Sequence, residues 1–240
     1  MDIKPKLLGI DWPSNTAALN DNGYCVIPSL LDVDTCGKLA RSYESTPGED
    51  PIAFRSTIDM ARYNFGKGEY KYFAYPLPAT VSLLREALYA PLAAIANSWA
   101  DALKSEKQWP NSLAEMIKRC HEAGQTRPTP LMLNYRQGDF NCLHQDLYGE
   151  VFFPLQVIIL LNDPTTDFSG GELIVVEQRP RMQSRPMVIP LQQGDAAVIP
   201  VRERPRKGKK GFHRVQMRHG VGEVRSGTRR TLGIIFHDAK

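Results

Sequence analysis

The second half of this chain is a series of short strand-like runs, and this pattern restricts the fold more than any other feature of the sequence. The runs are rich in β-branched and aromatic residues and are separated by Gly, Pro and Asp; they cover residues 131–135, 152–161, 172–176, 187–191, 196–201 and 231–236. Several short strands with turns at this spacing predict two packed sheets, as in a jelly roll.

Helical patterns dominate the first half of the chain. Asp32 precedes an apolar stripe at helical spacing, which is typical of a capped amphipathic helix. A second helical region begins near Thr80 and is interrupted by Pro91. A third begins after Ser112 and ends at Gly124, so three helical regions precede the strands.

These two patterns together predict an α+β fold. Its core is a jelly roll, or double-stranded β-helix, formed by residues 131–240. Residues 1–130 are expected to form a helical region that packs on this core, supplies a lid for the substrate and is integral to the fold.

The whole-chain composition favours a soluble globular protein. With 240 residues, of which 42% are hydrophobic, the chain is long enough to bury a substantial core. No apolar run approaches the length of a membrane span and the first residues lack a secretory signal, so we expect a cytoplasmic protein with no membrane partner. The oligomeric state stays open. Four cysteines without paired spacing are expected to be reduced core residues: Cys25, Cys36, Cys120 and Cys142.

Positive charge is concentrated in one segment, Arg202–Arg218. It holds 8 of the 30 Lys and Arg residues and 1 of the 26 Asp and Glu residues, which leaves 22 basic and 25 acidic residues elsewhere. Such a run is either a solvated loop or a basic surface that binds a polyanion such as nucleic acid. Composition alone slightly favours the loop, and Gly208 and Gly211 indicate that it is mobile.

Two histidines and one aspartate have the residue types of a mononuclear iron site. His144 and Asp146, separated by one residue at the end of a strand, project to the same side because strand side chains alternate. His219 would complete a face of two imidazoles and one carboxylate. This ligand set leaves adjacent positions open on Fe(II) for an oxo-acid and dioxygen. The His-x-Asp pair is weak evidence alone, because the spacing often arises by chance.

The segment from His219 to Leu232 resembles the histidine strand, turn and arginine strand of Fe(II)/2-oxoglutarate dioxygenases. The resemblance implies that Gly227 supplies the turn and that Arg229 binds the distal carboxylate of 2-oxoglutarate. Thr231 lies two residues after Arg229, on the same face of the strand, and is expected to share that contact. Arg230 should face the opposite side of the strand.

The segment from Tyr135 to Asp146 resembles the corresponding strand of AlkB-type nucleic-acid demethylases. The resemblance rests on Tyr135-x-x-Gly138 and on His144-Gln-Asp146 preceded by Leu143. In that family the tyrosine contacts 2-oxoglutarate, and this implies the same role for Tyr135. The alternative for Tyr135 is a core aromatic residue whose hydroxyl binds a backbone group.

Three other histidines compete for the second imidazole position. His213 lacks an arginine at the required offset, so His219 is the preferred ligand. His237 follows the last predicted strand and His121 lies near a helix end, and both are expected to be surface or capping residues.

The resemblance implies a specific chemistry. Fe(II) held by His144, Asp146 and His219 would use 2-oxoglutarate and O2 to oxidise a substrate C–H bond, with succinate and carbon dioxide as co-products. Oxidation of an N-methyl group would release formaldehyde and the demethylated nitrogen. The protein would position the reactants and exclude water.

The substrate is indicated less directly. The segment Arg62–Tyr75 interleaves aromatic and basic residues, which is typical either of a base-stacking lid or of a half-buried β-hairpin. Together with Arg202–Arg218 it favours a dioxygenase that demethylates modified or damaged nucleic acid, with the base unstacked or single-stranded. The alternatives are a protein or small-molecule hydroxylase of the same superfamily and, from another class, a non-catalytic jelly-roll module that binds nucleic acid.

Overall fold

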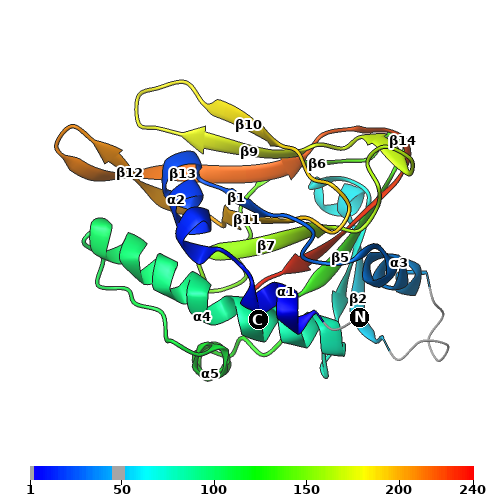
Figure 1. The fold of residues 1–240 in the computed structure, drawn as a ribbon, viewed down its shortest axis with the longest axis horizontal. Coiled ribbons are helices and arrows are strands. Elements are labelled where there is room, and N and C mark those ends of the chain that lie inside the picture. The colour runs from blue at the N-terminus through cyan, green and yellow to red at the C-terminus, as the bar shows by residue number, and fades with distance from the viewer. Residues whose placement is uncertain (1–2, 45–51) are drawn as a thin grey trace.

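The computed structural model describes residues 3–44 and 52–240. Within these ranges the chain forms five α-helices and one short 3-10 helix. Helices α1, α4 and α5 lie together on one side of the molecule, α2 rises from there alongside the strands, and α3 lies at one end (Figure 1). They are α1 (Lys4–Leu8), α2 (Trp12–Asn22), α3 (Val33–Ser42), η1 (Met60–Tyr63), α4 (Ala79–Ala102) and α5 (Leu113–Glu122).

The strands form two antiparallel sheets. The larger sheet has the order β1-β11-β7-β14-β5-β4-β2, with β8 paired to β14, and the smaller has the order β10-β9-β13-β6-β3, with β12 paired to β13. The strands are β1 (Cys25–Ile27), β2 (Phe54–Asp59), β3 (Gly66–Lys67), β4 (Glu69–Phe73), β5 (Leu131–Arg136), β6 (Phe140–His144), β7 (Leu155–Leu160), β8 (Phe168–Gly170), β9 (Leu173–Gln178), β10 (Arg185–Ile189), β11 (Ala196–Pro200), β12 (Glu203–Gly208), β13 (Gly211–Val221) and β14 (Val224–Ile234).

The two sheets pack face to face, and helices cover the outer face of the larger one. The main apolar cluster joins side chains of α4 to side chains of β7 and β14, whereas a second cluster fills the space between the sheets. This arrangement confirms the predicted α+β fold with a jelly-roll core. The sheet interior is therefore where any site built from inward-facing side chains must lie.

Helix starts agree with the sequence prediction. Asp32 accepts a hydrogen bond from the Thr35 N–H at the start of α3, and Ser112 accepts one from Glu115 at the start of α5. Each side chain satisfies a backbone donor that the first helical turn leaves free. Both helices were expected from these capping residues and from the apolar stripes that follow.

Helix α4 corrects two expectations. It continues through Pro91, because burial of eleven of its residues outweighs the one backbone hydrogen bond that a proline removes. Its 24 residues are also apolar enough, by length and composition alone, to cross a membrane, although no such run was expected from the sequence. Half of its most apolar window is buried inside the protein, where α4 packs against β7 and β14.

Residues before 131 contribute strands as well as helices. Strands β2 and β4 extend the larger sheet beyond β5, and β3 pairs with β6 in the smaller sheet. The segment Arg62–Tyr75 thus forms part of both sheets, which is closer to the half-buried hairpin than to a separate lid. The division of the chain at residue 130 stays a prediction.

The basic segment is not a mobile loop, which corrects the interpretation from composition. Strands β12 and β13 pair over Arg202–Arg218 as a hairpin whose tip projects from the sheet (Figure 1). Arg204 is buried and its Nη2 contacts Glu177 Oε2 at 2.5 Å, while Arg206 binds the same carboxylate. Because Glu177 lies on β9, far along the chain, the sequence pattern around the arginines does not reveal this anchor.

Two further expectations concern side chains near the core. Cys25, Cys36 and Cys120 are buried free thiols as predicted, but Cys142 is exposed on β6. His237 is fully buried, so the prediction that it lies at the surface is wrong. Its Nδ1 accepts a hydrogen bond from the Phe153 N–H at 3.1 Å.

Burial of His237 predicts a specific pH dependence of stability. Burial, and then the nearby Arg85 cation, lower the pKa of His237 from 6.5 to about 4. A histidine with a depressed pKa stays neutral in the folded state while the unfolded chain takes up a proton. Its contribution to stability is complete above pH 6.5 and is lost as the pH falls toward 4.

We expect His237→Asn to flatten this dependence, because the Asn oxygen can accept the Phe153 N–H but cannot be protonated. Between pH 7 and pH 4.5 the wild type should lose about 2–3 kcal/mol more unfolding free energy than the variant. Urea unfolding of both proteins at the two pH values measures this difference. Equal losses would contradict the role given to His237.

Candidate metal centre

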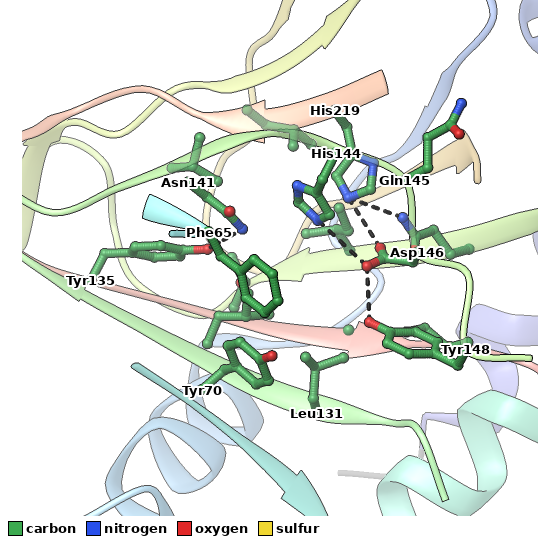
Figure 2. A pocket seen from close by; sticks show the side chains of 18 of the residues that line it. Phe65, Tyr70, Leu131, Tyr135, Asn141, His144, Gln145, Asp146, Tyr148 and His219 are labelled. Atoms are coloured by element: carbon green, nitrogen blue, oxygen red, sulfur yellow. Dashed lines mark hydrogen bonds and ion pairs between the residues drawn. The ribbon is translucent and has the colours of Figure 1, made fainter. Parts of the chain in front are cut away.

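The smaller sheet brings two histidines together. His144 is the last residue of β6, His219 lies on β13, and the sheet register places these two residues opposite each other. Asp146 follows two residues after the end of β6, and Figure 2 shows its carboxylate beneath both imidazole rings. The structure therefore assembles the three residues that the sequence predicted as metal ligands.

The three side chains are close enough to share one ion. His219 Nε2 lies 3.1 Å from Asp146 Oδ2, and His144 Nε2 lies 3.4 Å from Asp146 Oδ1. One donor atom from each residue can be chosen so that all lie within 4.8 Å of one another. His219 is buried and the other two side chains are partly accessible, so the cluster is open on one side.

The electrostatics favour a carboxylate anion between the rings. Burial opposes ionisation of Asp146, but His219 and His144 outweigh it and hold the pKa of the carboxyl well below 3.8. Burial, followed by the neighbouring His144, lowers the pKa of His219. For His144 the opposing effect of burial is exceeded by the hydrogen bond and charge of Asp146, so its pKa is raised.

The hydrogen-bond pattern fits a metal. His144 Nδ1 lies 2.8 Å from the Cys142 carbonyl oxygen and must carry the proton that it donates. Either a proton on Nε2, which the raised pKa of His144 favours, or a metal ion bound by the neutral ring can lie between Nε2 and the anionic carboxylate oxygen. A backbone carbonyl bound to the other ring nitrogen is typical of histidine ligands to metals. Two neutral imidazoles and one carboxylate suit Fe(II).

The larger sheet supplies the facing wall. Arg229 and Thr231 lie on β14, opposite Tyr135 and Leu133 of β5 in the register. All four side chains line the cavity that contains the metal ligands. Arg230 instead lies outside this cavity, as expected, and binds Asn134 and Glu44. The strand alternation thus places the predicted co-substrate residues on the same side as the candidate metal ligands.

One predicted residue has a different role from the one inferred. Gly227 does not form the turn between the histidine and arginine strands, because β13 ends at Val221 and β14 begins at Val224. Gly227 lies inside β14 with φ at +75°, packed against β8. A Cβ there would collide with the Asp167 carbonyl, so this close approach explains the glycine.

Arg229 is a buried cation that forms no ion pair with another described residue. Its side chain is 2% exposed, and Nη1 has no hydrogen-bond partner among the described residues. Burial lowers the pKa of the guanidinium to about 10, which still leaves it charged at neutral pH. The guanidinium carbon Cζ of Arg229 lies 5.6 Å from the centre of the Tyr135 ring. An unpaired buried cation is costly unless a ligand completes it.

The cavity between the sheets has a volume of about 330 Å³, which is sufficient for a small ligand. Apart from the metal ligands and Arg229, its wall is mostly aromatic and aliphatic. Figure 2 shows Phe65, Tyr70 and Tyr148 around the opening below the two imidazoles. The site therefore combines a cluster that could hold a metal ion, a buried cation and an apolar chamber.

Three further polar residues at the site were not identified from the sequence. The Asn141 amide donates to the Tyr135 hydroxyl at 3.2 Å, Gln156 Nε2 lies 3.2 Å from His219 Nε2, and Tyr148 donates to Asp146 at 2.9 Å. A signal existed for Gln156, the polar residue within an otherwise apolar predicted strand, and for Tyr148, which lies two residues after Asp146. No local signal marks Asn141.

The competing histidines lie elsewhere. His213 is exposed on the basic hairpin, and His121 is near the end of α5, where its Nε2 lies 3.0 Å from Asp238. His237 is buried but binds Phe153. Among the described residues, only His144, Asp146 and His219 form a cluster that could hold a metal ion.

Sequence comparison connects this chain to one family and to two mycobacterial proteins. The profile of the family Oxygenase-NA, described as an oxygenase catalysing oxidative methylation of damaged DNA, matches residues 68–239. Two uncharacterized proteins from two strains of Mycobacterium tuberculosis are each 50% identical over 167 residues, which is 70% of this chain and 72% of theirs.

Structural comparison connects the fold to solved oxygenases. A prolyl-4-hydroxylase from Pseudomonas putida has a TM-score of 0.53 at 12% identity, with 95% of this chain and 99% of that chain covered. An oxidoreductase of the 2OG-Fe(II) oxygenase family from Burkholderia pseudomallei has a TM-score of 0.52 at 16% identity, with 96% and 93% covered. These similarities establish the shared fold.

Proposed function

The chain belongs to the Oxygenase-NA family, and from this premise we propose that it is an Fe(II)- and 2-oxoglutarate-dependent dioxygenase that demethylates modified or damaged nucleic acid. One observation carries the proposal. The cluster of two histidines and one aspartate opens into the same apolar cavity as the buried cation Arg229, whose Nη1 has no hydrogen-bond partner in the described part of the chain.

Each reactant has residues suited to bind it. His144, Asp146 and His219 would hold Fe(II) on one sheet. Arg229 would bind the distal carboxylate of 2-oxoglutarate through two parallel hydrogen bonds, assisted by Thr231. The Tyr135 hydroxyl, which Asn141 keeps oriented at 3.2 Å, would contact the same co-substrate. The apolar cavity wall would exclude water from the reacting carbon.

Bound Fe(II) with 2-oxoglutarate supplies the oxidation of a C–H bond by dioxygen, with succinate and carbon dioxide as co-products. For an N-methyl group, insertion of one oxygen atom gives an N-hydroxymethyl group. Loss of formaldehyde from that group returns the proton to nitrogen and leaves the unmethylated base. The role of the cavity is to hold the methyl carbon against the open side of the metal cluster.

An exposed aromatic pair beside the cavity supports a nucleobase substrate. Phe65 lines the cavity and stacks on Tyr63, with ring centres 5.5 Å apart and planes inclined by 19°. Tyr63 is 55% exposed and Phe65 46% exposed, so these flat surfaces stay available for stacking. A base drawn out of a strand could lie against this pair before it enters the cavity.

The basic hairpin formed by β12 and β13 supports binding to a polyanion. Lys209 and Lys210 lie exposed at its tip and form no ion pair with another described residue. Strand β13 continues directly from this tip to His219, so phosphate contacts at the tip and the metal cluster are connected by one rigid strand. Phosphate binding would supply affinity without reading the sequence.

We expect succinate and formaldehyde to form in amounts that depend on a methylated single-stranded oligonucleotide, when Fe(II), 2-oxoglutarate and oxygen are present.

Lys209→Glu with Lys210→Glu should weaken oligonucleotide binding. The slope of log affinity against log salt should decrease by about 1.4, because each single-strand phosphate contact contributes about 0.7. Fluorescence anisotropy at several salt concentrations measures this slope.

Lys104→Glu with Lys118→Glu is the charge-matched control, since these exposed lysines lie on the helical side of the molecule. This control should leave oligonucleotide binding nearly unchanged. Turnover of a prolyl peptide or a free amino acid, without turnover of any methylated oligonucleotide, would contradict the proposed nucleic-acid substrate.

The cytoplasmic location expected from the sequence stays a prediction.

A further inference from the structure

The two oxygens of Asp146 have different surroundings. Oδ1 accepts a hydrogen bond from the Tyr148 hydroxyl at 2.9 Å and lies 3.4 Å from His144 Nε2. Oδ2 lies 3.1 Å from His219 Nε2. Figure 2 shows the Tyr148 ring below the carboxylate, on the side opposite the imidazoles. The Tyr148 hydroxyl therefore engages Oδ1, while Oδ2 faces only His219 among these side chains.

Tyr148 is held in place from several directions. Its ring packs edge-on against Tyr72, at 6.2 Å between centres and 88° between planes, and lies 5.9 Å from His237. Its carbonyl oxygen accepts the N–H of Lys240. The position of the hydroxyl thus depends on a packed environment and not on a free rotamer.

The loop that carries Tyr148 is also anchored. The Gln125 side chain donates to the Val151 carbonyl at 2.8 Å and accepts the Val151 N–H at 2.9 Å. Gly149 packs so closely on this side chain that a Cβ would collide with the Gln125 amide. The chain just after Asp146 therefore has little freedom to draw the Tyr148 hydroxyl away from the carboxylate.

From this geometry we propose that Tyr148 is a positioning residue that limits Asp146 to binding the metal through one oxygen. A carboxylate can bind a metal through one or both oxygens. If both bound, Asp146 would occupy two positions and one fewer would remain for 2-oxoglutarate and oxygen, which together need three. The Tyr148 hydroxyl prevents this by holding Oδ1.

The inference rests on the proposed function, because it requires a site that binds Fe(II) and 2-oxoglutarate. We expect Tyr148→Phe to retain bound Fe(II) but to raise the dissociation constant of 2-oxoglutarate by about 10-fold, the scale of one lost hydrogen bond to a charged group. Anaerobic titration followed by the visible charge-transfer band measures this constant without turnover.

Tyr24→Phe is the matched control, because Tyr24 packs beside β1 and is not among the residues that line the cavity. Its 2-oxoglutarate constant should stay within about twofold of wild type. Equal constants for wild type and Tyr148→Phe would overturn the inference and leave the proposed function intact. Absence of the band in the wild type would overturn both.

A second measurement avoids any dependence on how the variant folds. A crystal structure of the wild type with Mn(II) and 2-oxoglutarate should contain Asp146 bound through a single oxygen, with Tyr148 donating to the other. Binding through both oxygens in that structure would overturn the inference. The same crystal with Tyr148→Phe is expected to contain Asp146 bound through both.

Discussion

Asp146→Ala is expected to lower the affinity of the site for Fe(II) by more than about 100-fold and to eliminate turnover. Loss of a residue that merely orients a ligand costs about 10- to 100-fold, so loss of a ligand should exceed that range. The variant retains two imidazoles but lacks the anion whose ionised form they stabilise. Without this charge, the remaining rings offer a weaker and less specific site.

The measurement uses thermal or urea unfolding with and without Mn(II). At a metal concentration of about 100 times the dissociation constant, binding should stabilise the wild type by about 2.7 kcal/mol, and the variant should gain nothing measurable. His219→Ala should behave like Asp146→Ala. His213→Ala is the control, since His213 is exposed on the hairpin and should leave the metal effect unchanged. A retained metal effect in Asp146→Ala would remove this residue from the site.

The residues of the site were predictable where their geometry is local. His144 and Asp146 project together because strand side chains alternate, and the same alternation separates Arg229 from Arg230. The pairing of His219 with His144 is different in kind, because it joins strands far apart in the chain. That contact was expected only through resemblance to a family in which both histidines bind one ion.

The basic segment illustrates why local composition failed. Its lysines and glycines are typical of a solvated loop, yet Arg204 is buried in the hairpin because Glu177 supplies a carboxylate from another strand. A charged residue can be buried when a partner pairs with it, and the sequence near Arg204 does not contain that partner. His237 was misplaced for the same reason, since tertiary packing alone decides its burial.

Tyr148 and Gln156 were missed although both carry signals. Sequence reasoning concentrated on residues that bind the metal or co-substrate directly, whereas these two act on the ligands Asp146 and His219. Gln156 is a polar residue that the structure buries in the larger sheet, and a buried amide needs a partner. Such residues can be proposed as site candidates before their contacts are known.

Arg229 has properties that separate ligand binding from stability. Its guanidinium is buried, Nη1 has no hydrogen-bond partner among the described residues, and burial lowers its pKa to about 10. A buried charge without a partner is costly to the folded state, so an apolar side chain of similar size in its place should not destabilise the protein. Arg230, on the outward side of the same strand, instead pairs with Glu44 and Asn134.

We therefore expect opposite phenotypes from two adjacent substitutions. Arg229→Met should raise the 2-oxoglutarate dissociation constant by about 100-fold, since loss of a buried charge partner costs about 3 kcal/mol and each 1.4 kcal/mol is tenfold. The unfolding free energy of the ligand-free protein should not fall. Arg230→Met should lower that free energy by about 1 kcal/mol and leave 2-oxoglutarate binding unchanged. Anaerobic titration measures the 2-oxoglutarate dissociation constant, and urea unfolding measures the unfolding free energy. If Arg229→Met lost metal binding but kept its affinity for 2-oxoglutarate, the role assigned to β14 would be wrong.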